Sequence, residues 1–375
     1  MSEWKKYKLG DAIKFGNGKV RPNSIGKIPV YGGNGILNFC DEANYENETI
    51  IIGRVGAYCG AVYYENKPIW VSDNALAVKP KEKFNAKFLF YLLKNLELNQ
   101  FAEGSSHPLV TQSLLNSIDV LITDDESEQR AIASVLSSLD DKIDLLHRQN
   151  RTLEGMAEAL FRQWFVEEAD EGWEEVKLGD LVVETIGGDW GEENESQDTI
   201  PVICLRGVDL QAIKDSGFSV DAPLRYIKQN SLDKRILKEN ELLLAGSGIG
   251  PIGKTLPINR KMLANYPHPV IYSNFCKRLR AESKEIAYFV EFSIYQLYKA
   301  GVLEQFHMGT SIPNFNMKGF LNYEIVIPPL EKIKMLSSFL SDWYNKKYDP
   351  QIRTLEKLRD TLLPKLMSGE VRVEL

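Results

Sequence analysis

One stretch, residues 127–165, constrains the fold of this chain more than any other. Its apolar residues recur every seventh position, and a second set follows each of them by four residues, which is the seam spacing of a coiled coil over about five heptads. The seam residues are Ile132, Leu136, Leu139, Ile143, Leu146, Asn150, Leu153 and Leu160. A helix of this length spans roughly 55 Å. Because it cannot bury its seam alone, the pattern predicts a partner helix, with Asn150 setting the register; packing on an ordinary core is the alternative.

An internal repeat supplies that partner. Trp4 with Lys8-Leu9-Gly10-Asp11 returns as Trp173 with Lys177-Leu178-Gly179-Asp180, and Arg151-Thr152-Leu153-Glu154 returns as Arg353-Thr354-Leu355-Glu356. Five looser echoes lie between them in the same order. They include Ile28-Pro29-Val30 with Ile200-Pro201-Val202, and Ser72-Asp73-Asn74 with Tyr272-Ser273-Asn274. The chain is therefore predicted to be a tandem duplication, in which each globular unit is followed by a long helix.

The second long helix is predicted to be less regular than the first. Its seam contains Leu336, Leu340, Leu355 and Leu362, but Asp349-Pro350 interrupts it. Proline removes a backbone donor and disfavours helix at the preceding residue, so we expect a break there. Two such helices can pack antiparallel, which would relate the globular units by pseudo-two-fold symmetry. The predicted boundaries are residues 1–125 and 169–330 for the globular units, and 126–168 and 331–375 for the helical segments.

Each globular unit has the pattern of a mixed α/β (α+β) fold. In the first, residues 47–55, 57–64, 69–71 and 75–78 are rich in β-branched and aromatic residues, which predicts strands. Residues 85–101 have apolar positions on one helical face, and residues 118–122 predict a closing strand. The second unit repeats this plan, with a helix over residues 284–301 and an acidic insertion at 190–198.

Composition narrows the class of protein further. There is no signal-peptide pattern and no apolar run near 18 residues, so we expect a cytoplasmic protein with no membrane association. Cys40, Cys59, Cys204 and Cys276 form no C-x-x-C pair, and the four histidines are not spaced with them for metal binding. We therefore expect buried free thiols, no metal site and no cofactor. A net charge of −7 means that nucleic-acid binding would need basic groups clustered on one face.

Two motifs suggest enzymatic alternatives. Residues 248–255, Gly248 to Lys254-Thr255, fit the P-loop pattern G-x-x-x-x-G-K-[ST], which holds phosphates when a helix follows. Here Pro251 interrupts the loop and Leu256-Pro257 follows it, so a Gly-rich turn between strands is favoured over a nucleotide hydrolase. Glu175-Val176-Lys177 has the E-x-K spacing of a stand-alone nuclease but lies in the opening that both units share. No catalytic constellation emerges, and we expect no catalytic residues.

The chain resembles the DNA-specificity (S) subunit of type I restriction-modification systems over nearly its whole length. The resemblance is carried by the duplication, by Leu160-Phe161-Arg162-Gln163-Trp164-Phe165, and by Leu362-Leu363-Pro364-Lys365-Leu366-Met367-Ser368-Gly369-Glu370-Val371. It implies that the two units are target-recognition domains, each reading half of a split site in double-stranded DNA. The helices would set the spacing and dock two methyltransferase (M) subunits, with restriction (R) subunits joining the complex. Adenine-N6 methylation and cleavage would belong to these partners.

Candidate DNA contacts are polar residues in corresponding turns of the two units, since Arg can bond guanine, Asn can pair with adenine, and small hydroxyls can hold phosphates. In the first unit they are Lys19, Arg21, Asn34, Arg54, Ser72, Asn74, Ser105, Ser106 and His107. In the second they are Arg206, Ser247, Lys254, Ser273, Asn274, Thr310, Ser311 and Asn314.

Overall fold

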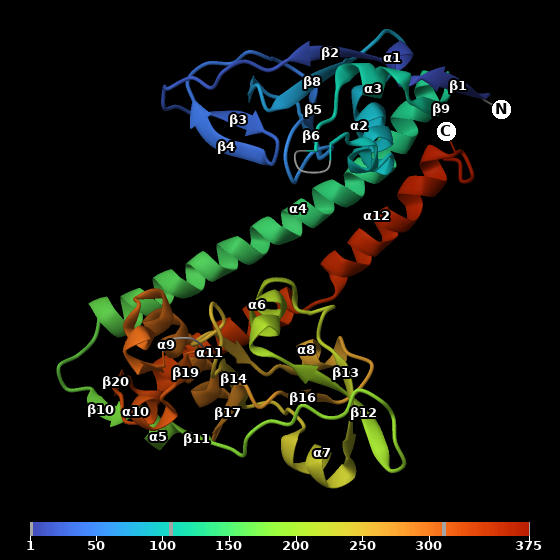
Figure 1. Ribbon diagram of the computed structural model, residues 1–375. Helices are drawn as coiled ribbons and strands as arrows, with labels where there is room; N and C mark the ends of the chain where they lie inside the picture. The colour runs from blue at the N-terminus through green and yellow to red at the C-terminus, as the bar shows by residue number, and fades with distance from the viewer. Residues whose placement is uncertain (1–2, 105–107, 310–312, 375) are drawn as a thin grey trace. The chain divides into compact units, whose positions relative to one another are not determined.

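The computed structural model describes residues 3–104, 108–309 and 313–374 (Figure 1). It divides into two compact units. Unit 1 comprises Met1–Asp144 with Leu355–Leu375, and unit 2 comprises Leu145–Thr354. The long helix α4 (Glu126–Arg162) contributes its first half to unit 1 and its second half to unit 2. The predicted boundaries of the four segments remain a prediction.

Unit 1 is built from three small sheets and short helices. A two-stranded antiparallel sheet pairs β1 (Trp4–Lys8) with β9 (Asp119–Thr123). An antiparallel four-stranded sheet has the order β2-β8-β5-β6, formed by Ile13–Asn17, Ala75–Pro80, Thr49–Gly53 and Val62–Glu65. The third sheet has the order β4-β3-β7, formed by Gly35–Cys40, Ile28–Gly32 and Trp70–Val71, with β3 and β7 parallel. The helices are α1 (Leu9–Ala12), α2 (Ala86–Asn95), the 3-10 turn η1 (Leu98–Phe101) and α3 (Gln112–Ser117).

Unit 2 repeats this topology strand for strand. The pair β10 (Glu174–Lys177) and β20 (Glu324–Ile327) corresponds to β1 and β9. The four-stranded sheet β11-β17-β14-β15 is formed by Val182–Glu184, Cys276–Ala281, Glu241–Ala245 and Thr255–Pro257. The sheet β13-β12-β16 is formed by Leu224–Lys228, Thr199–Leu205 and Val270–Tyr272. Its helices α5 (Leu178–Leu181), α9 (Lys284–Lys299) and α10 (Met317–Leu321), with η3 (Val302–Phe306), correspond to α1, α2, α3 and η1.

Unit 2 also contains helices for which the described part of unit 1 has no counterpart: α6 (Gly207–Ser216), α7 (Gln229–Arg235) and α8 (Arg260–Ala264). The short pair β18 (His307–Met308) and β19 (Asn314–Phe315) stands where unit 1 has the isolated antiparallel bridge Glu103–Leu109. The predicted acidic insertion lies in the loop that precedes β12. The duplication is therefore confirmed: the two units share one topology and differ in the additional elements of unit 2.

Backbone hydrogen bonds align the two copies residue by residue. Leu9 N donates to Ile118 O, and Leu178 N donates to Tyr323 O in the same way. They also correct two of the sequence echoes. Ser72 N donates to Tyr31 O, and Ser273 N donates to Leu205 O, so Ser72 corresponds to Ser273 rather than Tyr272. By the same bonds, Ile28 is equivalent to Val202, whereas the Ile-Pro-Val echo aligned it with Ile200, two residues earlier. The two differ because strand register follows pairing rather than sequence identity.

Several predicted boundaries shift for local reasons. The predicted strand 57–64 begins only at Val62, since residues 54–61 form a turn. The predicted helix 85–101 starts where expected, with the Asn85 side chain accepting from Phe88 N. It ends at Asn95 because Glu97 has a left-handed backbone (φ 46°), and η1 follows.

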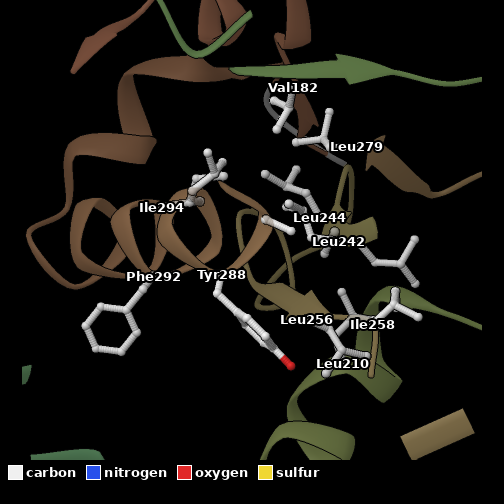
Figure 2. Close-up of a cluster of buried hydrophobic side chains, with 14 of the residues drawn as sticks. Val182, Leu210, Leu242, Leu244, Leu256, Ile258, Leu279, Tyr288, Phe292 and Ile294 are labelled. Atoms are coloured by element: carbon white, nitrogen blue, oxygen red, sulfur yellow. The ribbon is translucent and has the colours of Figure 1, made fainter. Parts of the chain in front are cut away.

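Each unit has its own apolar core. In unit 2 the core gathers side chains from the four-stranded sheet, α6 and α9, as Figure 2 shows for Leu242, Leu244 and Leu256. Phe292 of α9 points away from those sheet residues, and its ring contacts Phe161 of α4 and Trp343 of α11 (Leu330–Lys347). In unit 1 the main core joins the four-stranded sheet and the β1–β9 pair to α2 and to the first half of α4. All four cysteines are buried and free, as predicted.

The long helices follow the predicted pattern. The Asp125 carboxylate accepts from Ser127 N and Glu128 N and so caps α4, which ends in a π-helical turn, Gln163–Glu167. The second helix breaks as predicted, into α11 (Leu330–Lys347) and α12 (Gln351–Met367), with Asp349-Pro350 between them.

Within each unit the helices pack antiparallel. In unit 1, Asp140 pairs with Arg359 and Glu128 with Arg372, and in unit 2, Glu154 pairs with Lys347 and Glu168 with Lys332. Of the predicted seam, Ile132, Leu136, Leu336 and Leu340 are fully buried and Ile143 is nearly so. The other seam residues are half-buried: Leu139, Leu146, Asn150, Leu153, Leu160, Leu355 and Leu362.

Candidate nucleic-acid interface

In unit 1, four separate segments meet at one end of the sheets. Arg54, directly after β5, donates its N–H to Asn74 O in the β7–β8 turn, and Ser72 N in the same turn donates to Tyr31 O at the end of β3. The fourth segment joins through Gly56 N to Pro108 O and Val110 N to Arg54 O. These bonds fix a cluster of turns, which we call turn cluster 1: residues 33–34, 54–56, 72–74 and 108–109.

Unit 2 builds the same cluster with the same bonds. Gly246 N donates to Phe275 O, Ser273 N to Leu205 O, Gly248 N to Pro313 O and Phe315 N to Gly246 O. The corresponding segments, 207–208, 246–248, 273–275 and 313–314, form turn cluster 2. Loops held by a rigid scaffold are where binding residues concentrate, so the repetition marks both clusters as candidate sites.

A glycine makes each cluster possible. A Cβ on Gly18 would overlap the carbonyl oxygen of Ser72, and a Cβ on Gly188 would overlap the carbonyl oxygen of Ser273. The next residues repeat a bond as well, since Lys19 N donates to Val71 O and Asp189 N donates to Tyr272 O. Lys19 in unit 1 therefore occupies the place of Asp189 in unit 2.

In unit 1 most of the described candidates face solvent. Lys19, Arg21, Asn34 and Asn74 are exposed, and Arg54 is half-buried. Ser72 is fully buried, and its hydroxyl has no hydrogen-bond partner among the described residues. The backbone of Ser72 takes part in the turn, and the predicted DNA contact of its side chain stays a prediction. Ser105, Ser106 and His107 lie outside the described residues.

In unit 2 some candidate side chains are exposed to solvent, and others are buried or bonded within the unit. Asn274 and Asn314 are exposed, whereas Ser247 and Ser273 are buried. The predicted DNA contacts of these four side chains stay predictions. Arg206 is held by Asp209, with Nε and Nη2 each bonded to one carboxylate oxygen. Burial raises the pKa of Asp209, but hydrogen bonds from Arg206 and Ser219 outweigh it and hold that pKa below its ordinary value. Thr310 and Ser311 lie outside the described residues.

Lys254 directly precedes β15, and its backbone O accepts from Ala245 N. It lines a small pocket with Lys214, Glu154, Asp215 and Tyr295, between β15, α6, α9 and the second half of α4. Two carboxylates beside the lysine make this pocket poorly suited to a phosphate. The prediction that Lys254 contacts a phosphate remains untested.

The P-loop resemblance ends in a strand rather than a helix. Residues 246–254 connect β14 to β15, and Thr255 starts β15 with its hydroxyl donated to Glu291. Gly253 N bonds to Ala245 O as Gly60 N bonds to Gly53 O in unit 1, so the loop is the repeated hairpin. Glu175 and Lys177 of the E-x-K motif lie on β10, the counterpart of β1.

Some exposed residues near turn cluster 1 escaped the sequence analysis. Ile36, Leu37 and Phe39 of β4 are each about half exposed, as is Tyr58 in the β5–β6 turn. Periodicity could not reveal them, because an apolar run in a strand predicts burial. Across the described ranges, no group of three or more His, Cys, Asp and Glu side chains is arranged to hold a metal ion. Of the helices the structure describes, none is long and apolar enough to span a bilayer.

The fold and its two clusters define a class of protein: a tandem pair of α/β units, each presenting the same set of turns and each packed on part of one long helix. The sequence model of the family described as "Type I restriction modification DNA specificity domain" matches residues 1–155 and again residues 170–357. The chain belongs to this family and is a specificity subunit of a type I restriction-modification system.

Curated relatives support the assignment over most of their length. The MjaIX specificity subunit of Methanocaldococcus jannaschii is 27% identical, covering 84% of this chain and 76% of the relative. The MjaVIII specificity subunit of the same organism is 26% identical, covering 99% of this chain and 94% of the relative. Among solved structures, the S subunit of a type I system from M. genitalium matches with a TM-score of 0.68 at 18% identity, covering 100% of this chain and 97% of that one. The last likeness concerns the fold alone.

Proposed function

We propose that this chain is a non-catalytic, sequence-specific subunit that reads a bipartite site in double-stranded DNA, with one half-site read by each unit. The observation that carries the proposal is the repetition of the turn cluster. Both clusters rest on the same backbone bonds, and both present exposed asparagines: Asn34 and Asn74 in unit 1, Asn274 and Asn314 in unit 2. An Asn side chain can pair with adenine through two hydrogen bonds, which suits base readout in the major groove.

The helices have the features of a spacer and a docking surface. The α4 helix is 37 residues long, and each of its halves is fixed to one unit by antiparallel ion pairs. We propose that the helices set the distance between the half-sites and dock two methyltransferase subunits. Restriction subunits would join the complex, and both adenine-N6 methylation and cleavage would be carried out by these partners.

The first test is the methylome of a host that expresses this chain with its methyltransferase. Wild type should methylate one bipartite motif, which reports both half-sites and their spacing. Asn74→Ala should relax one position of one half-site, and Asn274→Ala should relax one position of the other, each at a cost of about 1–3 kcal/mol. A matched control is Asn322→Ala, in the α10–β20 turn, because Asn322 belongs to neither cluster.

The second test concerns the spacer. Insertion of one heptad after Asn150 keeps the seam pattern and should lengthen the gap while leaving each half-sequence readable. An unchanged gap would contradict the spacer role. Loss of specificity at both half-sites on Asn74→Ala alone would contradict the division of labour between the units.

A further inference from the structure

The β4 strand of unit 1 exposes apolar side chains that its fold does not use. Residues 36–39 are all exposed, and Ile36, Leu37 and Phe39 keep 48%, 44% and 50% of their surface in contact with solvent. The strand lies at the edge of the sheet β4-β3-β7, and Figure 1 shows the β3–β4 hairpin at the periphery of its unit. A run of large apolar side chains open to water on an edge strand indicates a partner.

The geometry points to DNA as that partner: we propose that the β3–β4 hairpin enters the major groove as a two-stranded ribbon and reads thymine through apolar contact with its C5-methyl group. The major groove admits a two-stranded ribbon, and apolar side chains recognise the thymine methyl there. This inference rests on the proposed function and assigns a base to unit 1.

A β-bulge shapes the ribbon. Tyr31 pairs with Ile36 and Val30 pairs with Asn38, which leaves Leu37 as the extra residue. The Leu37 side chain lies over Gly32, where a Cβ would collide with it. A bulge turns a side chain away from the regular alternation of a strand. Here the bulge lies near the tip of the hairpin, and both Leu37 and its neighbour Ile36 are exposed.

The segment beside β4 is suited to a phosphate backbone. Residues 18–27 contain Lys19, Arg21 and Lys27 and no acidic residue, and all three cations are exposed. Gly26 N donates to Phe39 O, so this segment borders the apolar strand. Cations flanking an apolar ribbon match the charge of DNA, in which phosphates border a groove that displays thymine methyl groups.

The ribbon is continuous with turn cluster 1. Gly33 at its tip lies against the carbonyls of Val55 and Asn74, since a Cβ there would be 3.1 Å and 3.6 Å from their oxygens. Asn34 follows at the turn itself. A duplex that contacts Asn34 and Asn74 would therefore also meet Ile36 and Leu37.

Unit 2 serves as an internal comparison, because β13, the counterpart of β4, exposes one large apolar side chain, Leu224, rather than a run of them, and the loop before β12 is acidic. After β12 the chain enters α6 instead of a tight turn, and α6 buries Leu210 and Ile213 in the core. The loop that corresponds to residues 18–27 is acidic, with Asp189, Glu192, Glu193, Glu195 and Asp198. Glu192 pairs with Tyr226 of β13 and so occupies part of that strand's edge. Thymine reading of this kind is thus confined to the half-site of unit 1.

The test replaces thymine with deoxyuracil, which removes the methyl group alone. The probes are DNA duplexes that contain the mapped site with uracil in one half-site or the other. The measurement is the affinity of each duplex for the complex of this chain with its methyltransferase. The half-site of unit 1 is the one altered by Asn74→Ala. Uracil there should weaken binding by the wild type about fourfold per contacted methyl group, the value for one buried CH₂-sized group. Uracil in the half-site of unit 2 should have no effect through this ribbon.

Two variants make the test specific. In Ile36→Ser/Leu37→Ser the uracil effect should disappear, because the apolar contact is already lost. Val220→Ser is the matched control, since Val220 is an apolar residue of unit 2 that is 79% exposed, and it should keep the wild-type response. Thermal unfolding of each variant checks that the fold is retained.

The outcomes separate this inference from the proposed function. Normal site-specific binding with no response to uracil in the half-site of unit 1, or with the same response in Ile36→Ser/Leu37→Ser, overturns the ribbon alone. If Ile36→Ser/Leu37→Ser no longer binds the methyltransferase but the recognised DNA sequence is unchanged, the ribbon proposal is overturned and β4 docks a protein instead. Absence of site-specific binding by the wild-type complex overturns the proposed function itself.

Discussion

Arg359 of α12 donates from Nη1 to the Oδ1 of Asp140 on α4, at 2.8 Å, within unit 1. The other carboxylate oxygen accepts from the Tyr91 hydroxyl of α2, also at 2.8 Å. One carboxylate thus joins three helices of the unit. Burial raises the pKa of Tyr91, and the hydrogen bond to Asp140 raises it further.

Replacement of Asp140 should therefore destabilise unit 1. Asp140→Ala leaves a tyrosine hydroxyl and a guanidinium without their acceptor, at an expected cost of about 1–3 kcal/mol in unfolding free energy. Urea unfolding of Asp140→Ala, Arg359→Leu and the double variant measures the coupling. Purely additive effects of the two single changes would show that the pair contributes nothing.

In unit 2 the corresponding junction is a buried carboxylate, Glu291 of α9. Its oxygens accept from Lys214 Nζ at 2.8 Å, Thr255 Oγ1 at 2.8 Å and Tyr344 Oη at 2.6 Å. Glu291 is fully buried, and Lys214 is 5% exposed. Burial raises the pKa of Tyr344 well above its ordinary value.

Breaking this junction should cost more than breaking a surface pair. Glu291→Ala strands a buried lysine, and the expected loss is about 3–5 kcal/mol in unfolding free energy. Glu331→Ala, which removes an exposed pair with Lys334, should change stability by less than about 1 kcal/mol. Denaturant unfolding compares the two, and similar losses would mean that burial of Glu291 does not determine its contribution.

Gly18 and Gly155 should respond in opposite ways to alanine. At Gly18 the methyl group would overlap a backbone carbonyl, so the turn at Ser72 must open. At Gly155, within α4, the added Cβ meets nothing within 4 Å. Gly155→Ala should raise stability by about 0.5–1 kcal/mol, whereas Gly18→Ala should lower it. Thermal unfolding measures both, and a neutral Gly18→Ala would show that the contact is easily relieved.

The lowered pKa of Asp209 should make the stability of unit 2 sensitive to acid. Because its folded pKa lies below the ordinary value of 3.8, it contributes stability at neutral pH that is lost as pH falls through the folded pKa. Asp209→Asn should therefore lower stability at pH 7 and flatten the decline below pH 4. Urea midpoints across that range measure the difference. If the stability of Asp209→Asn falls below pH 4 as steeply as that of the wild type, the protons that destabilise the fold are taken up by other carboxylates.

The local patterns of the sequence were reliable where neighbouring residues decide the outcome. The heptad spacing predicted α4, Asp349-Pro350 predicted the break before α12, and the repeated Trp-x-x-x-Lys-Leu-Gly-Asp openings predicted the duplication. In each case the physical cause, helical periodicity or a missing backbone donor, lies within a few residues of its effect.

What the sequence determined by itself was the architecture: two copies of one α/β unit, each ending in a long amphipathic helix. Only the tertiary structure decided which polar residues are open to a ligand. The side chains of Ser72 and Ser273 are buried, and Arg206 is bonded to Asp209. Ile36 and Leu37 remain exposed. Burial is set by strands and turns brought together from distant parts of the chain, and no spacing within one segment encodes it.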